Sequence, residues 1–305
     1  MQICSGPAPV PAHLRGGAVA IGNFDGVHLG HQAVVAAAQA HPGPHGAAVF
    51  KPHPRQFFHP DAPPFRLQTS AQRARALAAL GVDALFETPF TADLARLTDE
   101  AFVREVLIDW IGARHVTVGF DFRFGRDRMG DAESLQRLGE RHGLSVDVID
   151  AVDDGRHAGK VSSSGIREAL QAGDPALAAA QLGRPFAIEG AVISGMQRAR
   201  SIGFPTANVA LGDYVRPRFG VYATRTDIGD GVWRAGVSNC GVKPTIGGVS
   251  EPLLETHIFD LSADLYGRTV ETQLVSFLRP ERKFESFEAL TAQIAKDAKD
   301  ARAAL

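Results

Sequence analysis

The chain has 305 residues, of which 45% are hydrophobic and 22% are charged. These values are typical of a globular protein with a sizeable core, and the length suggests about two domains. The net charge of −2 gives no broad positive field for nucleic acid or an anionic membrane, so neither is an expected partner.

The first half of the chain alternates short apolar runs with helix-like segments. Buried strands are predicted at 17–22, 46–50, 82–87, 114–119 and 144–149, and helices at about 29–40, 70–80, 98–110 and 131–142. This alternation indicates a parallel sheet covered on both faces. A further helical stretch, 164–183, contains Asp174 and Pro175, which predict a second helix start inside it.

The second half has a different texture. Strand-like segments, several with apolar/polar alternation, lie at 186–193, 220–228, 231–239, 253–261 and 269–278, separated by turns rich in Gly, Asp and Pro. This pattern predicts an antiparallel barrel or sandwich. Ser286 predicts the start of a closing amphipathic helix with Glu288 in its first turn. The pattern changes from alternating strands and helices to successive strands between Leu182 and Arg184, so the predicted domains are residues 1–183 and 184–305.

The ends and the cysteines of the chain bear on its location. No apolar run approaches the ~18 residues of a membrane span. The N-terminal segment contains prolines where a signal peptide has an apolar core. Cys4 and Cys240 are far apart in sequence, which favours a reducing cytoplasm over a disulfide framework.

The segment GNFDGVHLGH, residues 22–31, lies where the first predicted strand passes into a helix. A glycine-rich turn before a helix start offers backbone N–H groups and the helix dipole to an anion. His28 and His31 share one face of the first helical turn and can donate hydrogen bonds to phosphate oxygens. Gly30 leaves room for a nucleotide near the backbone. This is the H-x-G-H arrangement of nucleotidyltransferases; a two-histidine metal site and coincidence are the alternatives.

Further motifs border predicted strands in the same order along the chain. They are FKPHPRQFF (50–58), VGFDFRFGRDRMGD (118–131) and VSSSGIREAL (161–170), followed by RARSIGFPTANV (198–209), GVYA (220–223), LLETHIFD (253–260) and LYGR to LRPERKF (265–284). Together with GNFDGVHLGH, this ordered set resembles the prokaryotic bifunctional riboflavin kinase/FAD synthetases over nearly the whole chain. The resemblance implies a Rossmann-like α/β nucleotidyltransferase domain followed by a six-stranded antiparallel β-barrel with a terminal helix.

The resemblance also implies roles in the first half of the chain. His28 and His31 would contact the ATP phosphates in catalysis. The other residues expected to bind the nucleotide or its phosphates are Gly22, Asn23, Asp25, Gly30, Asp121, Ser163, Ser164 and Arg167. The serines taken alone also fit a polar helix N-cap. Lys51 departs from the acidic residue expected before PHP, which leaves the role of that position open.

In the second half, Thr206 and Asn208 stand two apart, so on an extended segment both side chains point the same way. Hydroxyl and amide oxygens suit Mg²⁺ that bridges nucleotide phosphates. Ala199, in the adjoining flap, replaces a glycine usual in the family. Taken alone, Glu255 is either a structural carboxylate in an ion pair or a functional one. The resemblance implies that Glu255 is the general base that accepts the proton of the flavin ribityl hydroxyl. The resemblance assigns Arg279 to flavin binding.

The sequence thus predicts a cytoplasmic enzyme that phosphorylates riboflavin with ATP and then adenylylates FMN, with release of pyrophosphate. Its expected ligands are riboflavin, FMN, FAD, ATP and ADP, with Mg²⁺ as cofactor, and a monomer or weak homo-oligomer is expected. No covalent nucleophile stands out, so in-line displacement is the simplest mechanism. Two alternatives remain: another H-x-G-H nucleotidyltransferase with a β-rich domain, and a non-catalytic flavin-binding protein.

Overall fold

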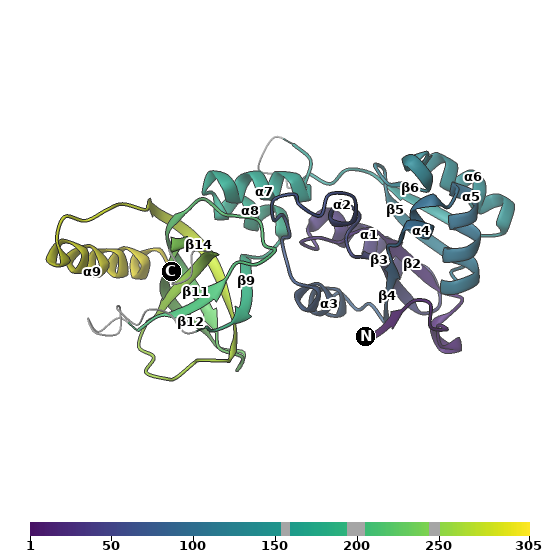
Figure 1. Ribbon diagram of the computed structural model, residues 1–305. Helices are drawn as coiled ribbons and strands as arrows, with labels where there is room; N and C mark the ends of the chain where they lie inside the picture. Colours follow the sequence, from purple (N-terminus) through teal and green to yellow (C-terminus); the bar gives the residue numbers. More distant parts are fainter. Residues whose placement is uncertain (154–158, 194–204, 244–250) are drawn as a thin grey trace. The chain divides into compact units, whose positions relative to one another are not determined.

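The computed structural model describes residues 1–153, 159–193, 205–243 and 251–305 (Figure 1). By internal contacts these form two compact units. The first contains residues 1–62 and 70–162, and the second contains residues 63–69 and 163–305. The flap position Ala199 lies outside the described residues. Among the described residues, no helix is both long and apolar enough to cross a membrane.

The first unit is built on a six-stranded parallel sheet. Its strands lie in the order β1 (Gln2–Ser5), β4 (Ala84–Pro89), β3 (His45–Lys51), β2 (Ala18–Ile21), β5 (His115–Gly119) and β8 (Ser145–Ile149). The five strands predicted for this half are confirmed within one or two residues at each end. The four-residue edge strand β1 was not predicted from the sequence.

Helices cover both faces of this sheet, as predicted. Ala18 and Ala20 of β2 pack in one buried cluster with α1 (Leu29–Gln39) and α3 (Ser70–Ala79). Val19 and Ile21 point the other way, into a cluster with η2 (Phe102–Ile111) and α6 (Ala132–His142). The shorter elements of this unit are η1 (Ala12–Leu14), α2 (Pro54–Phe58), α4 (Ala92–Arg96), α5 (Asp99–Ala101), β6 (Arg123–Phe124), η3 (Arg126–Arg128) and β7 (Gly130–Asp131).

The helix predicted at 98–110 has a mixed form. Thr98 caps α5 by accepting a hydrogen bond from the Ala101 amide at 3.1 Å, and the chain continues as the π-helix η2. The Arg15 guanidinium donates to the Trp110 carbonyl at 2.6 Å and to the Asp109 carbonyl at 2.9 Å. These bonds satisfy carbonyl groups that a helix end leaves without an intrahelical partner.

The described residues of the second unit form a six-stranded antiparallel sheet that curls into a barrel. Its strands lie in the order β10 (Ala207–Ala210), β13 (Glu251–Ile258), β12 (Trp233–Lys243), β11 (Gly220–Asp227), β14 (Thr269–Pro280) and β9 (Phe186–Ala191). The Ile193 amide donates to the Asn208 carbonyl at 2.9 Å, which brings the two outer strands together. The predicted fold class is confirmed.

Three helices complete the second unit. α7 (Ser163–Ala172) and α8 (Pro175–Leu182) lie together (Figure 1), and their buried side chains share one core cluster with the barrel. The Asp174 side chain accepts from the Leu177 amide at 2.9 Å, which confirms the predicted helix start. α9 (Phe287–Ala304) begins after Ser286, whose hydroxyl accepts from the Ala289 amide at 3.2 Å, as predicted.

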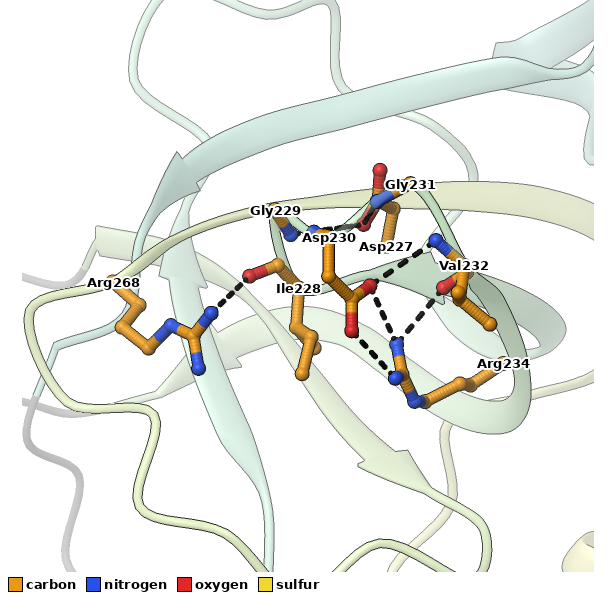
Figure 2. Close-up of polar contacts among 8 residues, drawn as sticks. All are labelled: Asp227, Ile228, Gly229, Asp230, Gly231, Val232, Arg234 and Arg268. Carbon is orange, nitrogen blue, oxygen red and sulfur yellow. Dashed lines mark hydrogen bonds and ion pairs between the residues drawn. The ribbon is translucent and has the colours of Figure 1, made fainter.

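A tight turn joins β11 to β12 (Figure 2). Asp227 Oδ1 accepts hydrogen bonds from the amides of Gly229, Asp230 and Gly231 at 2.9–3.0 Å. The Asp230 carboxylate in turn binds the Arg234 guanidinium through both oxygens. Hydrogen bonds from Arg234 and from the Val232 amide lower the pKa of Asp230. This turn fixes the register of β11 against β12, which pair from Asp227 opposite Trp233 to Gly220 opposite Cys240.

Candidate active sites

The loop after β2 occupies a special place in the parallel sheet. The chain leaves β2 toward β3 and β4 on one side and returns to β5 on the other, so β2 lies where the strand order reverses. In open α/β sheets, ligands bind at the carboxyl ends of the strands at such a switch point. Residues 22–28 lie there, between the end of β2 and the first turn of α1.

His28 and His31 form a stacked pair at the start of α1. His28 is the N-cap, and its Nδ1 accepts a hydrogen bond from the His31 amide at 3.3 Å. The two imidazole rings lie 3.6 Å apart and within 20° of parallel. Because Nδ1 of His28 is an acceptor, the neutral ring carries its proton on Nε2. The cap therefore fixes His28 as an Nε2–H donor.

Gly30 matters to this arrangement because of His28. A Cβ atom on Gly30 would lie 3.2 Å from both Nδ1 and Cε1 of the His28 ring. That separation is shorter than ordinary van der Waals contact, so a side chain at position 30 would displace the imidazole. Access for a nucleotide is the reason predicted from the sequence for this glycine, and contact with the His28 ring is a second reason within the chain itself.

The loop before His28 holds an unusual backbone conformation. Phe24 has φ +49° and Val27 has φ +43°, values that β-branched and bulky residues rarely adopt. Both side chains are fully buried, and the Asp25 carboxylate is buried with them. Burial of these apolar groups offsets the backbone strain, which concentrates at functional sites in many proteins.

Asn23 also belongs to this loop. Its backbone carbonyl accepts from Arg73 at 3.4 Å, whereas its side-chain Oδ1 is buried and accepts no hydrogen bond among the described residues. A buried amide oxygen without a donor is costly, so a ligand donor placed there would be stabilised. Gly22 precedes Asn23 at the end of β2, and a Cβ there would make only ordinary contact with the Phe24 ring.

Lys51, which stands where an acidic residue was expected, forms an ion pair with a residue of the neighbouring strand β4. Its ammonium group binds both oxygens of Glu87 at 3.1 and 3.2 Å. Glu87 is buried and also accepts a hydrogen bond from the Ser5 hydroxyl at 3.2 Å. The carboxylate that was expected at position 51 is thus replaced by a lysine, which neutralises a carboxylate on β4.

The other nucleotide-binding residues predicted for the first half lie in two places. Asp121 follows β5 in the first unit, and its Oδ2 accepts from Lys160 at 3.3 Å. Ser163, Ser164 and Arg167 belong to α7 of the second unit. Arg167 Nε donates to the Phe65 carbonyl at 2.7 Å within that unit. A place for Asp121 near the nucleotide, and phosphate binding by Ser163, Ser164 and Arg167, stay predictions.

The barrel brings three of the residues predicted for the second half, Asn208, Glu255 and Arg279, onto one row of paired strand positions. Glu255 of β13 lies directly opposite Asn208 of β10 on one side and Asn239 of β12 on the other. Asn239 in turn faces Val221 of β11, and Val221 faces Arg279 of β14. Residues directly opposite each other in antiparallel strands share a face, with Cβ atoms about 4.5–5.5 Å apart. Asn239 was not singled out from the sequence.

Asn208 has an unsatisfied polar atom in this row. The residue is only 4% exposed, and its Oδ1 accepts no hydrogen bond among the described residues. Its Nδ2 reaches the Thr206 carbonyl at 3.5 Å. An orphaned buried amide oxygen, close in sequence to a half-buried threonine hydroxyl, matches the hard oxygen ligands that Mg²⁺ takes.

Glu255 lies on the opposite face of β13 from the buried residues Leu254, Thr256 and Ile258. Its side chain is half-buried. A carboxylate in this position can reach a ligand, in contrast to one enclosed in the core. His257 lies on the same face, and its Nδ1 makes a hydrogen bond with the Pro205 carbonyl at 3.0 Å.

Arg279 is engaged within the protein. Its Nε and one terminal nitrogen donate to the two carboxylate oxygens of Asp297 at 2.9 and 2.6 Å. Asp297 lies on α9 and is buried, and Gln293 donates to it from one turn earlier on the same helix. This bidentate pair fastens α9 to β14 beside the row. Flavin binding by Arg279 stays a prediction.

Comparisons with known proteins agree with this architecture. A FAD synthetase family model matches residues 10–165, and a riboflavin kinase family model matches residues 182–305. The bifunctional riboflavin kinase/FMN adenylyltransferase of Pseudomonas fluorescens is 41% identical over 94% of this chain and 92% of its own length. The protein of the same name from Escherichia coli K12 is 39% identical over 90% of this chain and 88% of its own length.

One solved structure matches the whole fold. It is named macrolide-efflux protein from Streptococcus pneumoniae, has 29% sequence identity and a TM-score of 0.85, and the match covers 98% of each chain.

Proposed function

Since this chain belongs to the bifunctional riboflavin kinase/FMN adenylyltransferase family and makes FMN from riboflavin and FAD from FMN, we propose that two separate groups of residues carry the two reactions. The group for adenylylation is the loop 22–31 with His28 and His31. The group for phosphorylation is the row of Asn208, Glu255 and Asn239 with Thr206. The observation that supports this division is that the two groups lie in different compact units.

In the kinase reaction, Glu255 is the general base. It accepts the proton of the terminal ribityl hydroxyl of riboflavin while that oxygen forms a bond to the γ-phosphorus of ATP. The bond from this phosphorus to the bridging oxygen breaks, and ADP leaves. Asn239, on the neighbouring strand, is a further polar group beside Glu255; its Nδ2 donates to Glu281 at 3.1 Å.

Thr206 and Asn208 fit the magnesium ion that phosphoryl transfer from ATP requires. The fit rests on the orphaned Oδ1 of Asn208 and on two neutral oxygen ligands spaced for one face of an extended segment. When bound, Mg²⁺ neutralises charge on the transferring phosphate. Asn208 and Thr206 would hold the ion on the strand that pairs with β13, where Asn208 lies opposite Glu255.

In the adenylyl reaction, an oxygen of the FMN phosphate attacks the α-phosphorus of ATP, and pyrophosphate leaves. His28 donates its Nε2–H to a phosphate oxygen, and its proton position is set by the N-cap bond at Nδ1. His31 stacks on His28 and shares the positive end of the α1 dipole. Asn23, with its buried Oδ1, accepts a hydrogen bond from the nucleotide.

The state of the two cysteines supports a location in the reducing cytoplasm. Cys4 and Cys240 are both buried free thiols, and burial raises the pKa of Cys240 to about 12. Such a thiol stays protonated and unreactive at neutral pH. We expect a monomer or a weak homo-oligomer.

The test is one assay with two readouts. The full chain is incubated with riboflavin, ATP and Mg²⁺, and FMN and FAD are separated by chromatography over time. FMN should rise first and FAD should follow. A preparation that accumulates neither product would contradict the whole assignment, and one that stops at FMN would contradict the role of the loop 22–31.

A further inference from the structure

Two histidines and an aspartate meet at the edge of the parallel sheet opposite the loop 22–31. His115 is the first residue of β5, Asp147 lies on β8, and His41 follows the end of α1. Their nearest nitrogen and oxygen atoms all lie within 4.8 Å of one another. Asp147 Oδ2 is 2.9 Å from His41 Nε2 and 3.3 Å from His115 Nε2.

The strand pairing explains why these residues converge. His115 lies opposite Ser145 and Thr117 lies opposite Asp147, so all four side chains share one face of the sheet. Thr117 donates to the Val34 carbonyl at 2.9 Å, which shows that α1 covers this face. The chain reaches His41 just past the end of α1, and the His41 ring stacks on the His115 ring at 3.3 Å.

Hydrogen bonding fixes the tautomer of His115. The single hydroxyl hydrogen of Ser145 is donated to the Arg114 carbonyl, 3.1 Å away. The Ser145 oxygen can therefore only accept in its 2.8 Å contact with Nδ1 of His115, so Nδ1 carries the ring proton. In the neutral ring, Nε2 is then a bare lone pair.

The lone pair on His115 Nε2 lies close to another hydrogen-bond acceptor, the Asp147 carboxylate. His115 is only 5% exposed, and its Nε2 makes no hydrogen bond among the described residues, although Asp147 Oδ2 lies 3.3 Å away. A buried nitrogen lone pair beside a carboxylate oxygen is unfavourable unless a cation lies between them.

We propose that His41 Nε2, His115 Nε2 and the Asp147 carboxylate bind one divalent transition-metal ion of the zinc class. Two imidazoles and one carboxylate are ligands that Zn²⁺ takes in proteins, with a water in the remaining position, whereas Mg²⁺ prefers oxygen ligands alone. The bond from His115 Nδ1 to Ser145 is the outer contact that orients ligating histidines. The ion would fasten the end of α1 to β5 and β8.

The first experiment reads the tautomer in the metal-free full chain at pH 7.5. Long-range ¹H–¹⁵N spectra should show His115 protonated at Nδ1 and bare at Nε2. A proton on Nε2 would overturn the proposal, because that proton would already bridge the ring to Asp147.

The second experiment titrates the tag-free full chain, stripped with a chelator, with Zn²⁺ and with Co²⁺ as a spectroscopic probe. One equivalent should bind, with the visible absorption of four-coordinate Co²⁺, and Zn²⁺ should raise the melting temperature of the chain. Asp147→Asn and His41→Gln should each weaken binding by more than tenfold, and Ser145→Ala by about 10–100-fold.

His142→Gln is the matched control, because His142 also contacts a carboxylate, Glu100 Oε1 at 3.1 Å, but no other histidine ring stacks on it in the part of the chain that the structure describes. The control should bind Zn²⁺ as the unchanged chain does. The same preparations should make FMN and FAD at normal rates, which verifies folding. Absence of binding, or binding that is equal in the unchanged chain and in Asp147→Asn and His41→Gln, would overturn the proposal.

Discussion

Asn208 and Glu255 lie directly opposite each other on the paired strands β10 and β13, and the Oδ1 atom of Asn208 is buried without a hydrogen-bond donor among the described residues. Under the proposed function, Glu255 as the general base and Asn208 as an oxygen ligand of Mg²⁺ belong to one site.

Asn208→Ala should lower kinase turnover by roughly 10–100-fold, because charge stabilisation by a bound metal ion is worth several kcal/mol. Its melting temperature should not fall, since the change removes a buried unsatisfied oxygen. Turnover measured against Mg²⁺ concentration should show a higher requirement. The control is Gln273→Ala, a half-buried amide of β14 outside the row. A variant that melts early and keeps its Mg²⁺ dependence would make Asn208 a structural residue.

The ion pair of Arg279 and Asp297 should contribute much of the free energy that holds α9 against β14. Both groups are largely buried, so Asp297→Asn should cost about 3 kcal/mol in the free energy of unfolding, since removing one partner leaves the other charge uncompensated. The comparison is Asp260→Asn, which breaks the solvent-exposed pair with Arg302 on the same helix and should leave the unfolding midpoint unchanged. Denaturant unfolding measures both. Equal midpoints for the two variants would show that α9 is held by other contacts.

Gly30→Ala should act through His28. Alanine favours the helix by up to ~1 kcal/mol, so the fold should tolerate the change. The new Cβ would lie 3.2 Å from the His28 ring and displace it. Because small misplacements of a catalytic group are costly, FAD formation from FMN should fall by about tenfold or more while FMN formation stays normal. Normal FAD formation would show that the position of His28 is not critical.

The domain boundary can be tested with two fragments. Residues 184–305 contain the whole barrel row and should convert riboflavin to FMN. Ile166, Leu170 and Leu182 of α7 and α8 are buried in one cluster with Phe186 of the barrel, so residues 163–305 should melt at a higher temperature. Equal melting temperatures would mean that α7 and α8 add nothing to the stability of the barrel.

Much of the fold could be predicted because the relevant signals are local. Each signal lies within a few residues of sequence. Examples are the apolar run of β2, the N-cap residues Asp174 and Ser286, and the change in the spacing of apolar residues from a helical period of 3.6 to a strand period of 2. The strand β1 is too short to give such a signal. The π-helix η2 differs from an α-helix in its i→i+5 hydrogen bonds and the wider turn that they close, which composition does not encode.

The candidate sites could be predicted only in part, for a related reason. His28, His31, Thr206, Asn208 and Glu255 stand in recognisable local motifs. Asn239 became evident only through the register of β12 against β13, and register depends on contacts between distant segments. The partner of Lys51 is Glu87, 36 residues away on β4, so the sequence revealed the departure at position 51 but not its compensation.

We propose that adenylylation depends on His28 and phosphorylation depends on Glu255, independently of each other. The most direct measurement assays both reactions separately in His28→Ala and Glu255→Gln, with riboflavin or FMN supplied, and records melting on the same preparations.

His28→Ala should lose about 100-fold or more in FAD formation and keep FMN formation, because a stabilising donor at a transition state is worth ~3 kcal/mol. Glu255→Gln should lose roughly 100–10,000-fold in FMN formation and keep FAD formation from supplied FMN. Both proteins should melt close to the unchanged chain. Loss of both activities in either variant, or a stable Glu255→Gln protein with normal kinase activity, would contradict the account.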